Sequence, residues 1–191
     1  MRMLVLASAS PRRRQLLEQL GLTFIVDPSA CREESSIEKE PHALARSLSL
    51  EKAKTVASRY KDAIVIAADT LGVFEGRIIG KPRNDAQARE ILTALSGRCH
   101  SVITGFSVLD SRTGKSITES VETRVVLTRL SSAEIDAYVQ SGEPLDKAGA
   151  YAIQGLGAAI VERTEGDFFN VVGLPLFALC RALEEFDIKI L

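Results

Sequence analysis

The segment that most constrains the fold is residues 3–21, which has the pattern of a strand that runs directly into a helix. Residues 3–7 are apolar and long enough for one buried strand. Ser10 and Pro11 then suit the N-cap and the first position of a helix. Leucines at positions 16, 17 and 20 recur at helical spacing, and Gly21 favours the end of that helix.

Three consecutive arginines, Arg12, Arg13 and Arg14, crowd the first turn of this predicted helix. Positive charge there is unfavourable by about 0.3–1 kcal/mol for each exposed residue, because the free N–H groups already carry partial positive charge. Three such charges favour a bound anion, and we expect a phosphate site. A solvated basic surface is the alternative, since the glycines of a Walker loop or a dinucleotide fingerprint are missing.

Length and composition narrow the class of protein. A chain of 191 residues suits a single domain, 1–191, either of one lobe or of two. The net charge of -1 argues against nonspecific nucleic-acid binding, so the phosphate site should be local. Three widely spaced cysteines without a CxxC pair fit a reducing cytosol better than a disulfide framework or a zinc site.

Targeting segments are not evident in the sequence. The apolar run near the N-terminus is too short for a secretory signal peptide. No stretch approaches the roughly 20 apolar residues of a membrane span. We therefore expect a cytoplasmic protein that does not associate with membranes.

Alternating strand and helix patterns along the chain predict an α/β fold. Strands are expected at residues 23–26, 63–68, 73–79 (a hairpin turning at 75–76), 100–109 and 115–127. Residues 158–162 and 168–172 suggest a further hairpin. Helices are expected at residues 41–58, from a cap at Asn84 or Asp85 to Leu95, after a capping box at Ser131 and Glu134, and from Pro175 onward.

Charged residues interrupt or follow three of these elements. Lys52 interrupts the apolar stripe of helix 41–58, so either its methylenes join the core or its ammonium reaches an anion. Asp69 follows buried strand 63–68 at its carboxyl end, where ligands bind in open α/β sheets, although a turn-forming Asp is also common there. Pro82 keeps Lys81 extended beyond the hairpin.

Two loops supply further polar candidates. The glycine-rich passage 142–157 is long and has few large side chains, which is typical of a functional loop, and it contains Gln154. The polar loop 31–36 contains Glu33 and Glu34. These residues either keep the loop solvated or act as acidic ligands that face a cleft.

The candidates combine cations and carboxylates without a paired nucleophile and base. His42 and His100, the two histidines, lie in no recognisable triad or metal-binding spacing. Carboxylates suit Mg²⁺ or Mn²⁺, and phosphoryl transfer needs positioning and charge neutralisation more than covalent catalysis. A carboxylate such as Asp69 could deprotonate a water or hold the metal, and the sequence does not separate these roles.

Five segments in this order resemble the Maf family of nucleoside-triphosphate pyrophosphatases: SASPRRRQLL, AADT, GKP, SGEPLDKAGAYAIQGLGA and GDFFNVVGLP. The resemblance implies a fold similar to the inosine-triphosphate pyrophosphatases, with an elongated mixed sheet flanked by helices and a central cleft. It implies a homodimeric hydrolase of nucleotide metabolism that releases pyrophosphate with a divalent metal, Mg²⁺ or Mn²⁺. It also implies removal of non-standard nucleotides and a link to arrest of septum formation.

The same resemblance assigns roles to individual residues. Asp69 would be the general base and would share the metal with Glu33 or its neighbour Glu34. The residues that would hold phosphates are Ser8, Arg13, Lys52 and Lys81. The residues that would tune substrate choice are Arg12, Thr70 and Gln154.

The late motif around Gln154 resembles the branch of the family that hydrolyses dTTP and UTP, and modified pyrimidine nucleotides are a further expectation. One amide both donates to and accepts from a pyrimidine edge, which suits Gln154 to this task. The pair Leu71-Gly72 departs from the bulky β-branched residues usual there and is expected to loosen the strand. The alternatives are a 7-methyl-GTP pyrophosphatase and a non-catalytic nucleotide-binding regulator of septum formation.

Overall fold

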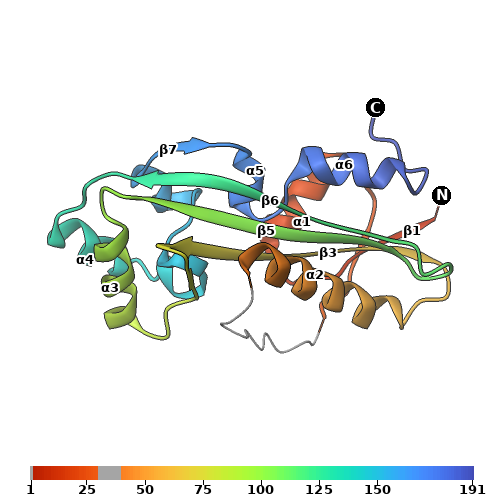
Figure 1. The fold of residues 1–191 in the computed structure, drawn as a ribbon, viewed down its shortest axis with the longest axis horizontal. Helices are drawn as coiled ribbons and strands as arrows, with labels where there is room; N and C mark the ends of the chain where they lie inside the picture. Colours follow the sequence, from red (N-terminus) through yellow and green to blue (C-terminus); the bar gives the residue numbers. More distant parts are fainter. Residues whose placement is uncertain (1, 30–39) are drawn as a thin grey trace. The chain divides into compact units, whose positions relative to one another are not determined.

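The computed structural model of the chain describes residues 2–29 and 40–191, and the strands in these ranges form one mixed seven-stranded sheet (Figure 1). The strand order is β2-β1-β3-β5-β6-β7, and β4 pairs with β3. The strands are β1 (Met3–Leu6), β2 (Ile25–Val26), β3 (Ala63–Phe74), β4 (Arg77–Ile79), β5 (Cys99–Asp110), β6 (Ser116–Leu127) and β7 (Val161–Glu165). Strand β1 is parallel to β2 and β3, whereas the β3–β4 and β6–β7 pairs are antiparallel.

Six α-helices and three short 3-10 turns accompany the strands in the described ranges. The helices are α1 (Pro11–Gln19), α2 (Pro41–Ala57), α3 (Asp85–Leu95), α4 (Ser132–Gln140), α5 (Phe168–Val172) and α6 (Leu176–Glu184). The 3-10 turns are η1 (Glu143–Asp146), η2 (Ala148–Ala150) and η3 (Gly155–Ala159). A mixed sheet with flanking helices confirms the predicted α/β class.

The local signals at helix ends are confirmed. The Ser10 side chain accepts a hydrogen bond from the Arg13 N–H, and Gly21 has a φ of 70°, which glycine adopts without strain. Ser131 and Glu134 form both hydrogen bonds of the capping box that starts α4. These ends depend only on nearby residues, so the sequence pattern predicts them well.

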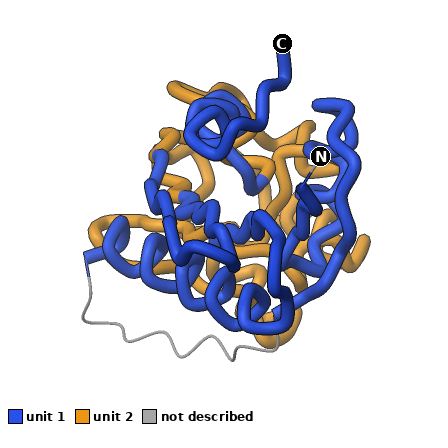
Figure 2. Tube along the Cα trace, turned by 90° about the vertical axis from the view of Figure 1, so that its right-hand side faces the viewer, with its two compact units in different colours: residues 1–69, 104–121, 173–191 blue, residues 70–103, 122–172 orange. Residues whose placement is uncertain are grey.

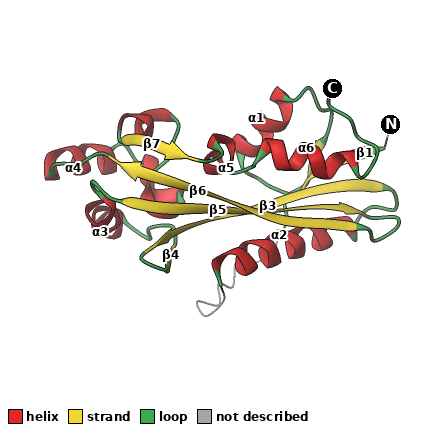
Figure 3. Ribbon diagram, turned by 45° about the horizontal axis from the view of Figure 1, so that its top comes forward, coloured by secondary structure: helices red, strands yellow, loops and turns green. Residues whose placement is uncertain are grey.

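The chain divides into two compact units (Figure 2), and each has its own apolar core. Unit 1 comprises residues 1–69, 104–121 and 173–191. In this unit α2 covers one side of the strands, while α1 and α6 lie on the other (Figure 3). The core beneath α2 joins Ala53 and Val56 of the helix to Val5, Val65 and Ala67 of the sheet.

Unit 2 comprises residues 70–103 and 122–172. Its core packs α3 and α4 around Leu92, Leu95, Ile135 and Tyr138, which are all buried. The turns η1 and η2 contact α3 in the same unit. Residues 143–150 of the glycine-rich passage are therefore packed against helices.

Two predictions about the strands are wrong. Strand β3 does not end at Ala68 but continues to Phe74, because pairing of Gly72 with Ile79 and Phe74 with Arg77 extends it. Gly72 therefore does not interrupt the strand. Residues 168–172 form helix α5 rather than a strand, because the Asp167 carboxylate accepts hydrogen bonds from the next backbone N–H groups, and β7 pairs with β6 instead.

The N-terminal strand is fixed to the sheet by a charged pair in unit 1. The Arg2 guanidinium donates to both carboxylate oxygens of Asp110, at 2.8 and 2.6 Å. The hydrogen bond from Arg2 is the main cause that holds the pKa of Asp110 well below its ordinary value of 3.8. A lowered pKa in the folded state stabilises the fold above the unfolded-state pKa, and this contribution is lost as the pH falls below it.

We expect Asp110→Asn to lower the free energy of unfolding at pH 7 by about 2 kcal/mol, the range for hydrogen bonds to charged groups. The difference between the wild type and this variant should shrink as the pH falls below about 4, where the unfolded carboxylate becomes protonated. Urea denaturation of both proteins at pH 7 and below pH 4 measures this difference in the free energy of unfolding. A difference that stays constant with pH would contradict the account.

None of the helices in residues 2–29 and 40–191 combines the length and the apolar character needed to cross a membrane.

Candidate functional site

The centre of the candidate site in unit 1 is an ion pair between Lys52 on α2 and Asp69 on β3. The Lys52 Nζ donates to the Asp69 Oδ1, and the two side chains are only 11% and 8% exposed. The helical spacing of α2 and the strand spacing of β3 explain why these two side chains lie on facing surfaces. Residues four apart on α2 share a face, so Lys52 lies in line with the buried residues Leu48 and Val56.

The same argument applies to the strand. Side chains two apart on β3 share a face, so Asp69 follows Val65 and Ala67, which pack beneath α2. Of the two interpretations of Lys52, the ammonium therefore does reach an anion, and that anion is the carboxylate of Asp69. A buried charge without a partner would cost several kcal/mol, so each of these residues requires the other.

The expected position of Asp69 at the tip of a strand is wrong. It lies inside β3 and is buried, with 5% of its surface exposed. Asp is uncommon within strands, which is why the Asp-Thr pair suggested a strand end. The pairing with Lys52 and the continuation of β3 toward β4 override that local preference.

The second part of the unit 1 site lies where β1 leads into α1. Arg13 donates from Nη1 to the Ser8 hydroxyl at 3.2 Å and from Nε to the Gly173 carbonyl at 2.8 Å. Ser8 is buried, and its oxygen also accepts from the Ser10 N–H at 3.2 Å. Because two donors occupy the acceptor sites of the Ser8 oxygen, its hydroxyl hydrogen is directed elsewhere.

The other two arginines of the cluster behave differently. Arg14 is exposed and forms an ion pair with Glu18 one turn later at 2.7 Å, so it belongs to the solvated surface. The Arg12 Nε is buried and has no hydrogen-bond partner among the described residues. A buried donor of this kind favours a bound acceptor, which agrees with the expected anion site at this helix terminus.

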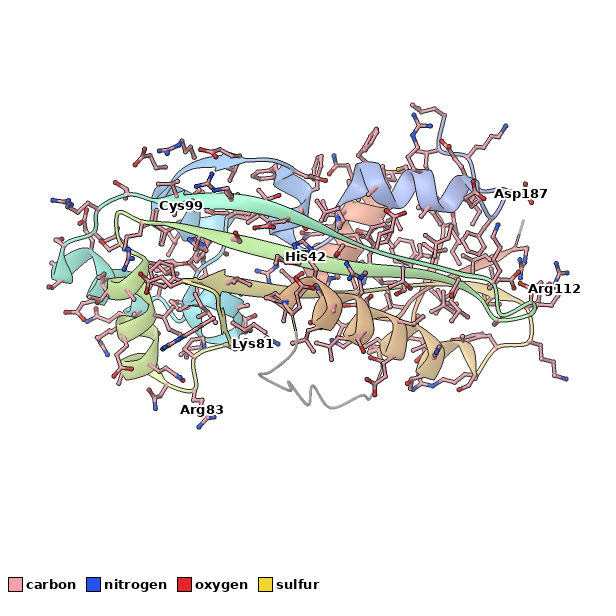
Figure 4. The ribbon with its side chains drawn as sticks, viewed as in Figure 1. His42, Lys81, Arg83, Cys99, Arg112 and Asp187 are labelled. Carbon is pink, nitrogen blue, oxygen red and sulfur yellow. The ribbon has the colours of Figure 1, made fainter. Side chains whose placement is uncertain are left out.

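The remaining described candidates belong to unit 2. Thr70 is half-buried in β3, and Lys81 is exposed in the loop between β4 and α3 (Figure 4). The N–H of Gly149 in η2 donates to the Gly80 carbonyl at 3.3 Å, which fixes the backbone next to Lys81. Gln154 lies at the start of η3 with its side chain exposed.

Sequence reasoning missed the polar groups that organise the passage around Gln154. The carboxylate of Glu143 accepts hydrogen bonds from the Tyr138 hydroxyl and from the N–H groups of Leu156 and Gly157. The closely spaced glycines at 155 and 157 were the available signal, since they indicate a tight approach of backbone to another group.

The buried histidine of unit 2 is paired with a tyrosine. The His100 Nε2 lies 2.7 Å from the Tyr151 hydroxyl. Burial lowers the pKa of His100 to about 4, so its ring is neutral at pH 7.

Among the described candidates, Asp69 is the residue whose chemistry suits a hard divalent cation. Asp69 supplies carboxylate oxygens, the ligands that Mg²⁺ and Mn²⁺ prefer. Glu33 and Glu34 lie outside the described residues, and residues 2–29 and 40–191 contain no group of three or more His, Cys, Asp or Glu side chains arranged to hold a metal. One or two carboxylates suffice where phosphate oxygens complete the coordination of Mg²⁺.

Comparison with known proteins gives matches along almost the entire chain. The family described as Maf-like protein matches residues 3–186. The dTTP/UTP pyrophosphatase of Methanococcoides burtonii is 51% identical over 191 residues, which cover 100% of this chain and 98% of that protein. The dTTP/UTP pyrophosphatase of Methanosarcina barkeri is 49% identical over 191 residues, covering 100% and 97%. That of Moorella thermoacetica is 49% identical over 187 residues, covering 98% and 96%.

Proposed function

The chain belongs to the family of Maf-like proteins, and on that premise we propose that it hydrolyses dTTP and UTP to the monophosphate and pyrophosphate. The proposal rests on the identity to dTTP/UTP pyrophosphatases, which reaches 51% over the full length of the chain. The observation that carries it is the buried Lys52–Asp69 pair, which places a carboxylate beside a cation on the α2 side of the sheet. A carboxylate and a cation are the groups that hydrolysis of a phosphoanhydride requires.

We assign the proton transfer to Asp69. Its carboxylate accepts a proton from the water that cleaves the anhydride bond between the α- and β-phosphates, and pyrophosphate leaves. Lys52 is paired with that carboxylate, and we assign it both to orienting the carboxylate and, as the family resemblance implies, to binding a phosphate oxygen. A bound Mg²⁺ or Mn²⁺, held by Asp69 with Glu33 or Glu34, would neutralise phosphate charge and polarise the reacting oxygens.

The remaining assignments concern binding. Ser8, Arg13 and Lys81 bind phosphate oxygens, because a hydroxyl, a guanidinium and an ammonium are all donors to such oxygens. The residues that we assign to the choice of nucleotide are Arg12, Thr70 and Gln154. The exposed amide of Gln154 supports this role, because it both donates and accepts and so matches a pyrimidine edge.

A panel of nucleotides tests the substrate. Purified protein is incubated with Mg²⁺ or Mn²⁺ and dTTP, UTP, CTP, dGTP, ATP or 7-methyl-GTP, and pyrophosphate release is measured. We expect dTTP and UTP to give the highest kcat/KM. Preference for 7-methyl-GTP would overturn the assignment of Gln154, and tight binding without turnover for any metal would favour a nucleotide-binding regulator.

The assignment of Ser8 gives a prediction for binding. We expect Ser8→Ala to raise the KM for dTTP about 3- to 10-fold with a smaller change in kcat, the size expected for one hydrogen bond of about 1 kcal/mol. The reason is that the substrate loses the hydroxyl as a donor, and Arg13 loses one of the acceptors that orient its guanidinium.

Ser10→Ala is the matched control for Ser8→Ala. It removes the N-cap of the same helix and should lower stability by about 1 kcal/mol while leaving the KM unchanged. If both variants raise the KM equally, loss of helix stability explains the effect and the role of Ser8 is disproved.

The homodimer stays a prediction, and sedimentation velocity at micromolar concentration tests it.

A further inference from the structure

We infer that Tyr138 and Glu143 are positioning residues that fix the backbone on both sides of Gln154 and thereby set the preference for a pyrimidine base. The inference rests on the proposed function, because it explains how Gln154 is held for base selection. All the groups involved lie in unit 2, on α4, η1, η3 and the segment between η2 and η3.

The Glu143 carboxylate holds the segment that follows Gln154. Its Oε1 accepts from the Gly157 N–H at 2.9 Å, and its Oε2 accepts from the Leu156 N–H at 3.1 Å. These N–H groups belong to η3, whose N-cap residue is Gln154 and which has no side-chain cap of its own. A carboxylate that accepts from free N–H groups at the start of a helical turn fulfils the role of that missing cap.

The Tyr138 hydroxyl holds the segment that precedes Gln154. It accepts from the Ala152 N–H at 3.1 Å and donates to the Glu143 Oε1 at 2.8 Å. The ring of Tyr138 is buried in the core of unit 2, so the hydroxyl is held by a fixed support. One connected set of hydrogen bonds therefore fixes residue 152 on one side of Gln154 and residues 156–157 on the other.

The glycines around Gln154 show how closely the backbone approaches these two side chains. A Cβ at Gly155 would lie 2.6 Å from the Glu143 Oε2, and Gly155 has a φ of 68°. A Cβ at Gly157 would lie 2.7 Å from the Tyr138 hydroxyl and 2.0 Å from the Ala152 carbonyl. Contacts below 3 Å leave no space for a side chain, so both positions require glycine.

The Glu143 side chain is negatively charged, which strengthens the hydrogen bonds that it accepts. Burial by itself would raise the pKa of Glu143, but the hydrogen bonds from Tyr138, Gly157 and Leu156, together with the charge of Lys147, lower it. The side chain is therefore ionised at neutral pH, and charge-assisted hydrogen bonds are about twice as strong as neutral ones. By contrast, the Gln154 side chain is exposed and so accessible to a ligand.

Binding sites typically combine a residue that contacts the ligand, here Gln154, with residues that hold its backbone in place. A contact residue discriminates between ligands only if its backbone is held within about 0.5 Å of the productive position. Tyr138 and Glu143 touch no substrate in this account and act through Gln154. Their loss should therefore affect the choice of base more than the rate of the chemical step.

Two variants and one control test the inference. Tyr138→Phe keeps the buried ring and removes the hydroxyl, and Glu143→Gln keeps the size of the side chain and removes its charge. Glu134→Ala is the control, because it removes the carboxylate that accepts from Ser131 in the capping box of the same helix, α4, and within the described part of the chain that carboxylate forms no hydrogen bond to residues 152–157. The readouts are amide hydrogen exchange of residues 152–157 and kcat/KM for dTTP, UTP, dGTP and ATP.

We expect both test variants to accelerate exchange at residues 152–157 and to lower the pyrimidine-to-purine ratio of kcat/KM about 10-fold, mainly through KM, as for a misplaced binding group. The control should lose thermal stability while its ratio stays unchanged. If the wild type is active and the ratio in both test variants is also unchanged, this inference alone is overturned. An inactive wild type would instead overturn the proposed function.

Discussion

Asp69→Asn is expected to lower the kcat for dTTP at least ~100-fold, the low end for loss of a general base. An amide accepts no proton from water, whereas it keeps the size and shape of the carboxylate. The variant should also lose about 3 kcal/mol of stability, because Lys52 is then left opposite a neutral group in a site where both side chains are nearly buried. Pyrophosphate release at saturating dTTP and thermal denaturation measure the two effects.

Two further variants make the result for Asp69 interpretable. Asp136→Asn changes a half-buried aspartate that pairs with Arg89 in unit 2 and that we assign no role in the reaction, so its kcat should stay within about 2-fold of the wild type. The double variant Lys52→Met with Asp69→Asn removes both charges, so it should be more stable than the single variant and equally inactive. A kcat equal to that of the wild type in Asp69→Asn would remove this residue from the mechanism.

Gly105→Ala is expected to destabilise unit 1 by about 3 kcal/mol or more, the upper range for overpacking in a core. Gly105 lies in β5 directly against the backbone of α2, and a Cβ there would be 2.2 Å from both the carbonyl carbon and the carbonyl oxygen of Ala45. Backbone atoms cannot rotate away, so α2 would have to shift from the sheet, and this helix carries Lys52. Loss of activity should accompany loss of stability.

Urea denaturation followed by circular dichroism measures the effect of Gly105→Ala. Gly80→Ala is the control, because no atom lies within 4 Å of the added Cβ and its stability should change by less than about 0.5 kcal/mol. A midpoint for Gly105→Ala equal to that of the wild type would show that α2 does not rest on β5 at this position.

The features that were predictable from the sequence depend on residues near one another in the chain. Helix α1 follows from Ser10, Pro11 and the leucine spacing, and α4 follows from its capping box. The Lys52–Asp69 pair was partly predictable from the sequence. The four-residue spacing on a helix and the two-residue spacing on a strand place each of these side chains on a defined face. Only the structure shows that the two faces meet.

The features that were missed depend on contacts between distant segments. Strand β3 continues past Asp69 because it pairs with β4, which local preferences do not include. Residues 168–172 have strand-like composition but form α5, because Asp167 caps them and Thr123 donates to the Asp167 carbonyl at 2.9 Å. The two backbone partners of Glu143 likewise lie 13 and 14 residues later, in η3, so no periodicity indicates them.

The most direct test of the proposed reaction is to identify its products. Wild-type protein is incubated with dTTP and Mg²⁺ or Mn²⁺, and the reaction is followed by phosphorus NMR. We predict equal amounts of dTMP and pyrophosphate, and no product from Asp69→Asn on the same timescale. Release of orthophosphate with dTDP, or equal turnover by the variant, would contradict the account.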